Sequence, residues 1–137
     1  MKVLVMYVDE FSYIPAQKNL ESAEDVTEGA TFSDSMLAFI QVEETDEEYD
    51  AKSREKKLVN HLKWTARKND CQKIILHSFA HLSDSKASVE FTRKIFDEAE
   101  KRLQNGGYET AQTPFGYFLD LNLKAPGHSL ARIWASL

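Results

Sequence analysis

Apolar positions follow two different spacings along the chain. Short apolar runs predict five strands, the first of which should be buried on both faces: residues 2–8, 36–43, 73–77, 108–113 and 117–124. Apolar residues that recur every three or four positions predict amphipathic helices at about residues 51–68 and 87–104. The order β-β-α-β-α-β-β favours an α/β fold with a mixed twisted sheet and two main helices.

The remaining segments carry weaker signals. Residues 15–35 lack a clear period and predict an irregular segment, and the apolar residues 130–137 are a candidate for a final strand. Thr45 and Glu48 have the spacing of a capping box, which would start the first helix. The glycine pair at residues 106–107 supplies the left-handed backbone conformation that ends the second helix.

Each predicted helix has one buried stripe. The expected stripe of the first helix is Leu58, Val59, Leu62 and Ala66. The expected stripe of the second helix is Val89, Phe96, Ala99 and Leu103. The other faces of the first helix carry the basic residues Lys52, Arg54, Lys56, Lys57, Lys63, Arg67 and Lys68.

The composition is that of one globular domain. The chain has 137 residues, of which 42% are hydrophobic, and a disordered chain would lack this apolar content. No apolar run approaches the roughly 20 residues that cross a bilayer. The single cysteine, Cys71, excludes an intrachain disulfide. We therefore expect a cytoplasmic domain with no membrane segment.

Charge is distributed unevenly around a formal total of −5. Residues 1–50 contain 13 acidic and 2 basic side chains, whereas residues 51–137 contain 9 acidic and 15 basic side chains. A polyanion would therefore approach the later segments, because attraction depends on local charge. The basic helix at residues 51–68 is the candidate contact, although a solvated surface helix has the same pattern.

Two histidines and the cysteine are the first candidates for metal binding or nucleophilic catalysis. His77 and His81 are four residues apart, but they span a strand end and a loop, which favours ordinary hydrogen-bonded histidines over a metal site. Asp70 should raise the pKa of the adjacent Cys71 thiol, which favours a structural thiol. We expect no metal and no cofactor.

The block Pro114-Phe115-Gly116-Tyr117 offers a rigid turn flanked by aromatic rings. Such a turn suits a nucleobase or a ribose, although a packed β-turn has the same signature. The block lacks the glycine spacing of a dinucleotide-binding or P-loop cradle.

Three sequence blocks taken together resemble a known family. They are residues 79–83 (Phe-Ala-His-Leu-Ser), 114–117 (Pro-Phe-Gly-Tyr) and 127–131 (Gly-His-Ser-Leu-Ala). Over essentially the whole chain, the sequence resembles the N-terminal editing domain of archaeal threonyl-tRNA synthetases, a relative of the D-aminoacyl-tRNA deacylases. The resemblance implies the deacylase-like fold, a homodimer, and hydrolysis of serine attached wrongly to tRNA(Thr). A second sieve is needed there because one methyl group is worth only about 1–3 kcal/mol in a binding pocket.

The resemblance also implies roles for individual residues. His81, Tyr117 and Phe118 fall at catalytic positions, and His81 would approach a hydroxyl of the terminal ribose. The implied substrate-binding positions are Val42, Ala80, Phe115, Gly116, Leu119 and Arg132. The implied partners are the acceptor end of serine-charged tRNA(Thr) and a synthetase catalytic module in cis or in trans.

The chain departs from the family pattern at two places. The family continues the Phe-Gly-Tyr block with Tyr-Lys, where this chain has Phe118-Leu119, and it has Glu where this chain has Arg132. Leu119 has no hydrogen-bond donor with which to stabilise an oxyanion. Two alternatives to an active editing domain stay open: a catalytically weakened tRNA-binding module of the same fold, and a D-aminoacyl-tRNA deacylase.

Overall fold

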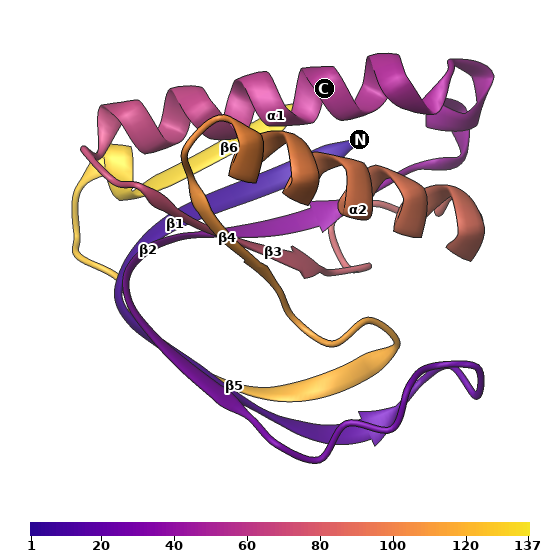
Figure 1. Ribbon diagram of the computed structural model, residues 1–137, viewed down its shortest axis with the longest axis horizontal. Coiled ribbons are helices and arrows are strands. Elements are labelled where there is room, and N and C mark those ends of the chain that lie inside the picture. The colour runs from indigo at the N-terminus through magenta and orange to yellow at the C-terminus, as the bar shows by residue number, and fades with distance from the viewer.

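A six-stranded mixed sheet carries both helices on one face in the computed structural model, which describes residues 1–137 (Figure 1). The strands are β1 (Lys2–Lys18), β2 (Ala30–Gln41), β3 (Lys73–Ser78), β4 (Glu109–Gln112), β5 (Tyr117–Lys124) and β6 (Arg132–Ser136). The helices are α1 (Ala51–Lys68) and α2 (Val89–Asn105), with short 3₁₀ helices η1 (Glu44–Glu48) and η2 (Ser129–Ala131). The predicted α/β fold is confirmed, and the candidate final strand forms as β6.

The sheet has the order β4-β3-β2-β1-β5, and β6 also pairs with β1. Strand β1 is antiparallel to β2, β5 and β6, whereas β3 is parallel to both β2 and β4. One edge of β1 serves two partners, because β6 pairs with its first residues, Lys2 to Met6, and β5 with its last, Glu10 to Lys18. Neither helix is apolar over enough of its length to span a membrane.

Strands β1 and β2 are much longer than predicted. The predicted irregular segment at residues 15–35 is wrong at both ends, because residues 15–18 belong to β1 and residues 30–35 to β2. The acidic pair Asp9-Glu10 interrupted the apolar run of β1 and was therefore interpreted as a strand end. Strands β1 and β2 instead continue and curl toward the half of the sheet that holds β5 (Figure 1). Asp34, opposite Asp9 on β2, has a φ of 48°, and these two residues do not pair although the register is the same on either side of them. The acidic residues mark a bend in the strands and not their ends.

Two apolar clusters lie on opposite faces of the sheet. Alternate residues of β2, such as Ala38 and Ile40, join the helix-side cluster with Leu58, Leu62 and the rest of the stripe of α1. The residues between them join a second cluster, which the curled half of the sheet covers: Val8, Phe11, Tyr13, Leu37, Phe39 and Ile75. Strand β2 is thus buried on both faces near its end. At the start of β1, Val3 and Val5 on the helix face are fully buried, whereas Leu4 and Met6 on the other face are only partly buried, so this strand is not buried on both faces there as predicted. Farther along β1, Val8 and Phe11 are fully buried in the second cluster.

Three predicted details of the helices are wrong. Thr45 and Glu48 do not cap α1; Asp50 does, by accepting a hydrogen bond from the Ser53 amide at 2.7 Å. Arg54 is buried and not solvated, because it forms an ion pair with buried Asp46 at 2.7 Å. Val89 is 41% exposed because it begins α2 immediately after the Ser88 cap, before the helix meets the core. The other predicted stripe residues of both helices are buried.

Cys71 is a buried thiol, as predicted, but Asp70 is not what perturbs it. Burial is the main cause that raises the pKa of this thiol, and the nearby Asp34 carboxylate raises it further. The Cys71 Sγ donates to the backbone oxygens of Asp34 and Lys73 at 3.3 and 3.4 Å. These contacts support a structural role at the bend in β2.

Candidate functional site

A cavity lies where the ends of β2 and β3 meet the β4–β5 turn. Its volume is about 420 Å³, and its walls come from seven segments: the loop after β1, the ends of β2 and β3, the loop after β3, the start of α2, the β4–β5 turn and β5. A cavity of this size suits a small organic group such as an aminoacyl-adenosine. We call it the His81 cavity.

The loop that follows β3 is held by one buried glutamine at the end of β2. The Gln41 Nε2 donates to the backbone oxygens of Ser83 and Ser85 at 2.9 and 2.8 Å. Its Oε1 accepts from the amides of Leu82 and Ser83 at 2.6 and 2.8 Å. The Ala87 amide also donates to the Val42 oxygen at 3.0 Å, so the loop is fixed on both sides of Lys86.

Aromatic rings and one buried hydrogen bond connect His81 to the sheet. The His81 ring packs edge-on against Phe79 with 5.0 Å between ring centroids, and Phe79 packs against Phe39 at 5.1 Å. His77, behind Phe79, shares a 2.8 Å hydrogen bond between its Nδ1 and the Thr113 hydroxyl. Burial lowers the pKa of His77 to about 4, so this imidazole is neutral at pH 7. The bond links the end of β3 to the start of the β4–β5 turn.

The β4–β5 turn is held against the loop after β1. Gly116 has a φ of 84°, and a Cβ added there would lie 2.8 Å from the Cβ of Ala23. Its carbonyl accepts from the Asn19 amide at 2.8 Å. The Tyr117 hydroxyl donates to the Glu24 oxygen and accepts from the Val26 amide, both at 2.9 Å. Glycine is required here by both backbone conformation and space.

The electrostatic character of the His81 cavity is positive. No carboxylate lines it, and Lys86 is the one lysine or arginine among its lining residues. The backbone N–H groups of Ala80 and His81 also have no hydrogen-bond partner within the protein. Both residues line the cavity, so two main-chain donors and one ammonium group are available to a ligand that develops negative charge.

Eight of the nine predicted site residues line this cavity: Val42, Ala80, His81, Phe115, Gly116, Tyr117, Phe118 and Leu119. The predicted juxtaposition of His81 with the 114–117 turn is therefore confirmed as geometry. Arg132 is not among the lining residues; it lies on β6, where its guanidinium donates to the Pro126 oxygen at 2.8 Å.

The lining side chains differ in the chemistry they offer. The Tyr117 hydroxyl forms its hydrogen bonds with the loop after β1, so this side chain holds the β4–β5 turn in position. Phe118 is 50% exposed and, like Leu119, has no group that can transfer a proton. His81 is exposed at the cavity and is the one lining imidazole that is not buried. Residues of the whole chain form no cluster of three or more metal-ligating side chains.

Two functional residues were missed from the sequence. Gln41 is the only polar residue in the apolar run 36–42, and a buried polar side chain must find hydrogen-bond partners, so its isolation was a usable signal. Lys86 had no such signal, because a lysine in a polar loop is ordinary. Its position at the cavity depends on the bonds that Gln41 and Val42 make to the loop.

Comparisons with known proteins agree on the fold and the family. Residues 1–137 match the archaea-specific editing domain of threonyl-tRNA synthetase. The chain is similar to threonine–tRNA ligases of Thermococcus sibiricus (29% identity over 136 residues, 97% of this chain) and Nitrosopumilus maritimus (27% over 133 residues, 96%). It spans about a fifth of the length of these relatives, 22% and 20% respectively.

A solved structure supports the fold independently. The c-Myc DNA unwinding element binding protein superposes with a TM-score of 0.67 over 100% of this chain and 99% of its own, at 11% sequence identity. At that identity the likeness concerns the fold alone, and it agrees with the predicted deacylase-like architecture. Because the family match covers every residue, the chain belongs to the archaea-specific editing domain family of threonyl-tRNA synthetases.

Proposed function

We propose that this domain hydrolyses the ester between serine and the terminal ribose of mischarged tRNA(Thr). The observation that carries the proposal is the His81 cavity, in which an exposed imidazole, two unpartnered backbone N–H groups and one ammonium group surround a space without carboxylates. Family membership supplies the class of substrate. The electrostatics suit a reaction whose transition state carries negative charge on the ester oxygen.

In this proposal each group has a separate task. Water attacks the ester carbonyl, the bond to the ribose oxygen breaks, and that oxygen takes up a proton while serine leaves. His81 holds the ribose hydroxyl that neighbours the ester. The N–H groups of Ala80 and His81 stabilise the developing oxyanion, and Lys86 adds a positive field. The side chains of Val42 and Phe115 and the backbone of Gly116 enclose the amino acid.

In this proposal the cavity distinguishes serine from threonine by the extra methyl group of threonine. Its β5 wall is apolar, with Leu119 and Leu121 beside Phe118. A synthetic site that accepts threonine cannot strongly exclude serine, because one methyl group is worth about 1–3 kcal/mol. An editing cavity that admits only the smaller amino acid corrects the resulting error.

The test is the release of labelled amino acid from charged tRNA(Thr). We expect release of L-serine to exceed release of L-threonine and of D-amino acids. Faster release of D-amino acids than of L-serine would identify a D-aminoacyl-tRNA deacylase and overturn the proposal. tRNA binding without any release would identify the weakened binding module, which Phe118 and Leu119 favour because neither can donate a proton or a positive charge.

We propose two further partners on the same basis. The first is a synthetase catalytic module, in the same chain or in a separate one, because the matched segment is about a fifth of each threonine–tRNA ligase. The second is another copy of the domain in a homodimer. Sedimentation equilibrium of the isolated domain tests the dimer, and a mass of 15.7 kDa would contradict it.

A further inference from the structure

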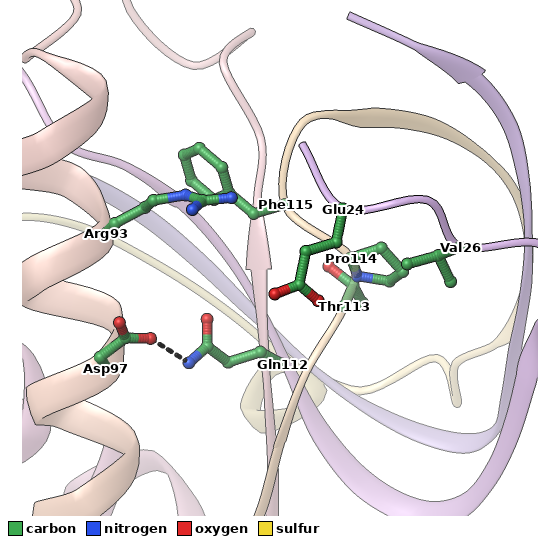
Figure 2. A pocket seen from close by; sticks show the side chains of 8 residues that line it. All are labelled: Glu24, Val26, Arg93, Asp97, Gln112, Thr113, Pro114 and Phe115. Atoms are coloured by element: carbon green, nitrogen blue, oxygen red, sulfur yellow. Dashed lines mark hydrogen bonds between the residues drawn. The ribbon is translucent and has the colours of Figure 1, made fainter. Parts of the chain in front are cut away.

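A second, smaller cavity lies on the other side of Phe115. Its volume is about 250 Å³, and Pro114 and Phe115 line both cavities. The opposite walls come from α2, which contributes Arg93 and Asp97, and from the loop after β1, which contributes Glu24 (Figure 2). We call it the Arg93 cavity. The β4–β5 turn separates a ligand in the Arg93 cavity from the His81 cavity, because this turn lines both.

One wall of the Arg93 cavity is a flat, partly buried stacking surface. The guanidinium carbon of Arg93 lies 5.0 Å from the centre of the Phe115 ring, and that ring also packs edge-on with Phe96 at 6.2 Å between centroids. The Arg93 Nε is buried and has no hydrogen-bond partner. The guanidinium forms no ion pair or hydrogen bond with the protein, so its terminal N–H groups remain free to donate to a ligand in the cavity. Arginine guanidinium groups and aromatic rings are common platforms for unstacked nucleobases.

The facing groups are hydrogen-bond acceptors. The Gln112 Nε2 donates to Asp97 Oδ1 at 3.0 Å and to Glu100 Oε1 at 3.2 Å, which turns its own oxygen toward Arg93 (Figure 2). The Glu24 carboxylate projects toward the same space and makes no side-chain hydrogen bond. With two carboxylates and one guanidinium, the lining is net negative, so a phosphate group is disfavoured. A neutral heterocycle with an exocyclic amine fits better.

We propose that the Arg93 cavity binds the cytosine that precedes the terminal adenosine of the tRNA acceptor end. This inference rests on the proposed function, which puts that adenosine in the His81 cavity next door. The cytosine N4 amine would donate to the carboxylates, and its O2 and N3 would accept from Arg93. Uracil would instead turn a carbonyl oxygen toward the carboxylates. The shared Pro114–Phe115 wall suits two consecutive, unstacked nucleotides in neighbouring cavities.

The first test compares dinucleotides by calorimetry with the wild-type protein: cytidylyl-(3′→5′)-adenosine, uridylyl-(3′→5′)-adenosine, and adenosine alone. One well-formed base contact should make the cytidine compound bind about tenfold more tightly than the uridine compound. In an NMR titration, the Arg93 Nε–H signal should shift with the cytidine dinucleotide and not with adenosine. Equal affinities for the two dinucleotides, or an Arg93 signal that does not move, would overturn the inference.

Variants separate this site from the proposed reaction. Asp97→Asn combined with Glu24→Gln should abolish the preference for cytidine and leave adenosine binding unchanged. Glu98→Gln is the matched control, because Glu98 is exposed on the same helix and outside the cavity. A preference that survives the double variant would overturn the inference. Serine release without any base preference would do the same while leaving the proposed function standing, and base preference without serine release would count against the proposed function alone.

Discussion

The two cavities on either side of Phe115 have opposite electrostatic characters although they share a wall. The His81 cavity has no carboxylate, and its charged side chain is a lysine; the Arg93 cavity has two carboxylates around one arginine. A group that develops negative charge is favoured in the first and disfavoured in the second. The β4–β5 turn thus divides a region suited to ester chemistry from one suited to reading a neutral base.

The largest expected effect comes from a change of one side chain, which should affect the His81 cavity and leave the Arg93 cavity unchanged. Replacing His81 by alanine should lower the rate of serine release by about 10²–10⁴, the range for a group that positions or transfers a proton. Binding in the Arg93 cavity and the melting temperature should not change, because His81 is exposed and its ring packs edge-on against Phe79 at the surface of the domain. Single-turnover kinetics on serine-charged tRNA measures the rate. Full activity in His81→Ala would mean that the chemistry lies outside this cavity.

A change in the shared wall should disturb both cavities together. Gly116→Ala introduces a Cβ 2.8 Å from the Cβ of Ala23 at a φ of 84°, so the turn must shift. Displacement of binding groups by about 1 Å can cost 10² in rate, and the strained backbone costs about 1–3 kcal/mol of stability. Gly127→Ala is the control, because a Cβ there meets nothing within 4 Å. Unequal losses of serine release and dinucleotide binding in Gly116→Ala would show that the turn does not hold the two cavities as a unit.

Adding a cation to the His81 cavity should increase the difference in charge between the two cavities. Leu119→Lys puts a second ammonium group on the wall of the His81 cavity, and it should accelerate serine release by about tenfold or more if charge on the oxyanion limits the rate. Arg132→Glu should add nothing, alone or in combination, because Arg132 is held at Pro126 outside the cavity. Distant changes usually have additive effects. Measured rates of the two single variants and the double variant test both statements, and slower release by Leu119→Lys would contradict the first.

The burial of His77 should make stability depend on pH. The pKa of His77 falls from 6.5 in the unfolded chain to about 4 in the folded one, because burial disfavours its charged form. The unfolded state therefore binds more protons between these values, and stability should decline as the pH falls from 6.5 to 4, by about 3 kcal/mol in total. His77→Gln keeps a hydrogen-bonding group and removes the titration. Urea unfolding of this variant should show a flatter pH profile in that window, and an unchanged slope would assign the effect to other groups.

The smallest effect concerns a surface that belongs to neither cavity. Charge reversal at Lys56, Lys57 and Lys63 on α1 should weaken tRNA binding roughly tenfold at low salt and reduce its salt dependence, because fewer counterions are released. Serine release at saturating tRNA should not change. Filter binding across a salt series measures the slope. An identical slope in the reversed variant would mean that α1 is only a solvated face of the domain.

The predicted elements succeeded where local pattern and tertiary environment agree. Strand β5 and helix α1 form at the predicted residues, and Gly107 adopts the expected left-handed conformation with a φ of 89°. The length of β1 could not be predicted, because Asp9 and Glu10 read as a strand end when the bend is not known. Its second half pairs with β5, which lies about a hundred positions later in the chain. Such a pairing leaves little trace in local sequence.

The candidate site, like the fold, was predictable from the sequence only in part. The blocks around His81 and Gly116 pointed to one cavity, and the structure brings them together. A match of sequence blocks also placed Arg132 at the site, and this was wrong. The pairing of β6 with β1 holds Arg132 outside the cavity. The Arg93 cavity could not be predicted at all. Its walls come from α2, the β4–β5 turn and the loop after β1, which no short motif connects.

The four hydrogen bonds of Gln41 have a consequence for the energetics of ligand capture. They order the loop from Leu82 to Ser85 in the free protein, so its conformational entropy is lost during folding and not during association. A pre-organised loop lets more of the contact energy appear as affinity. It also removes the need for a closing motion before the acceptor end can enter. Under the proposed function, such a loop would favour rapid binding and release of correctly charged tRNAs.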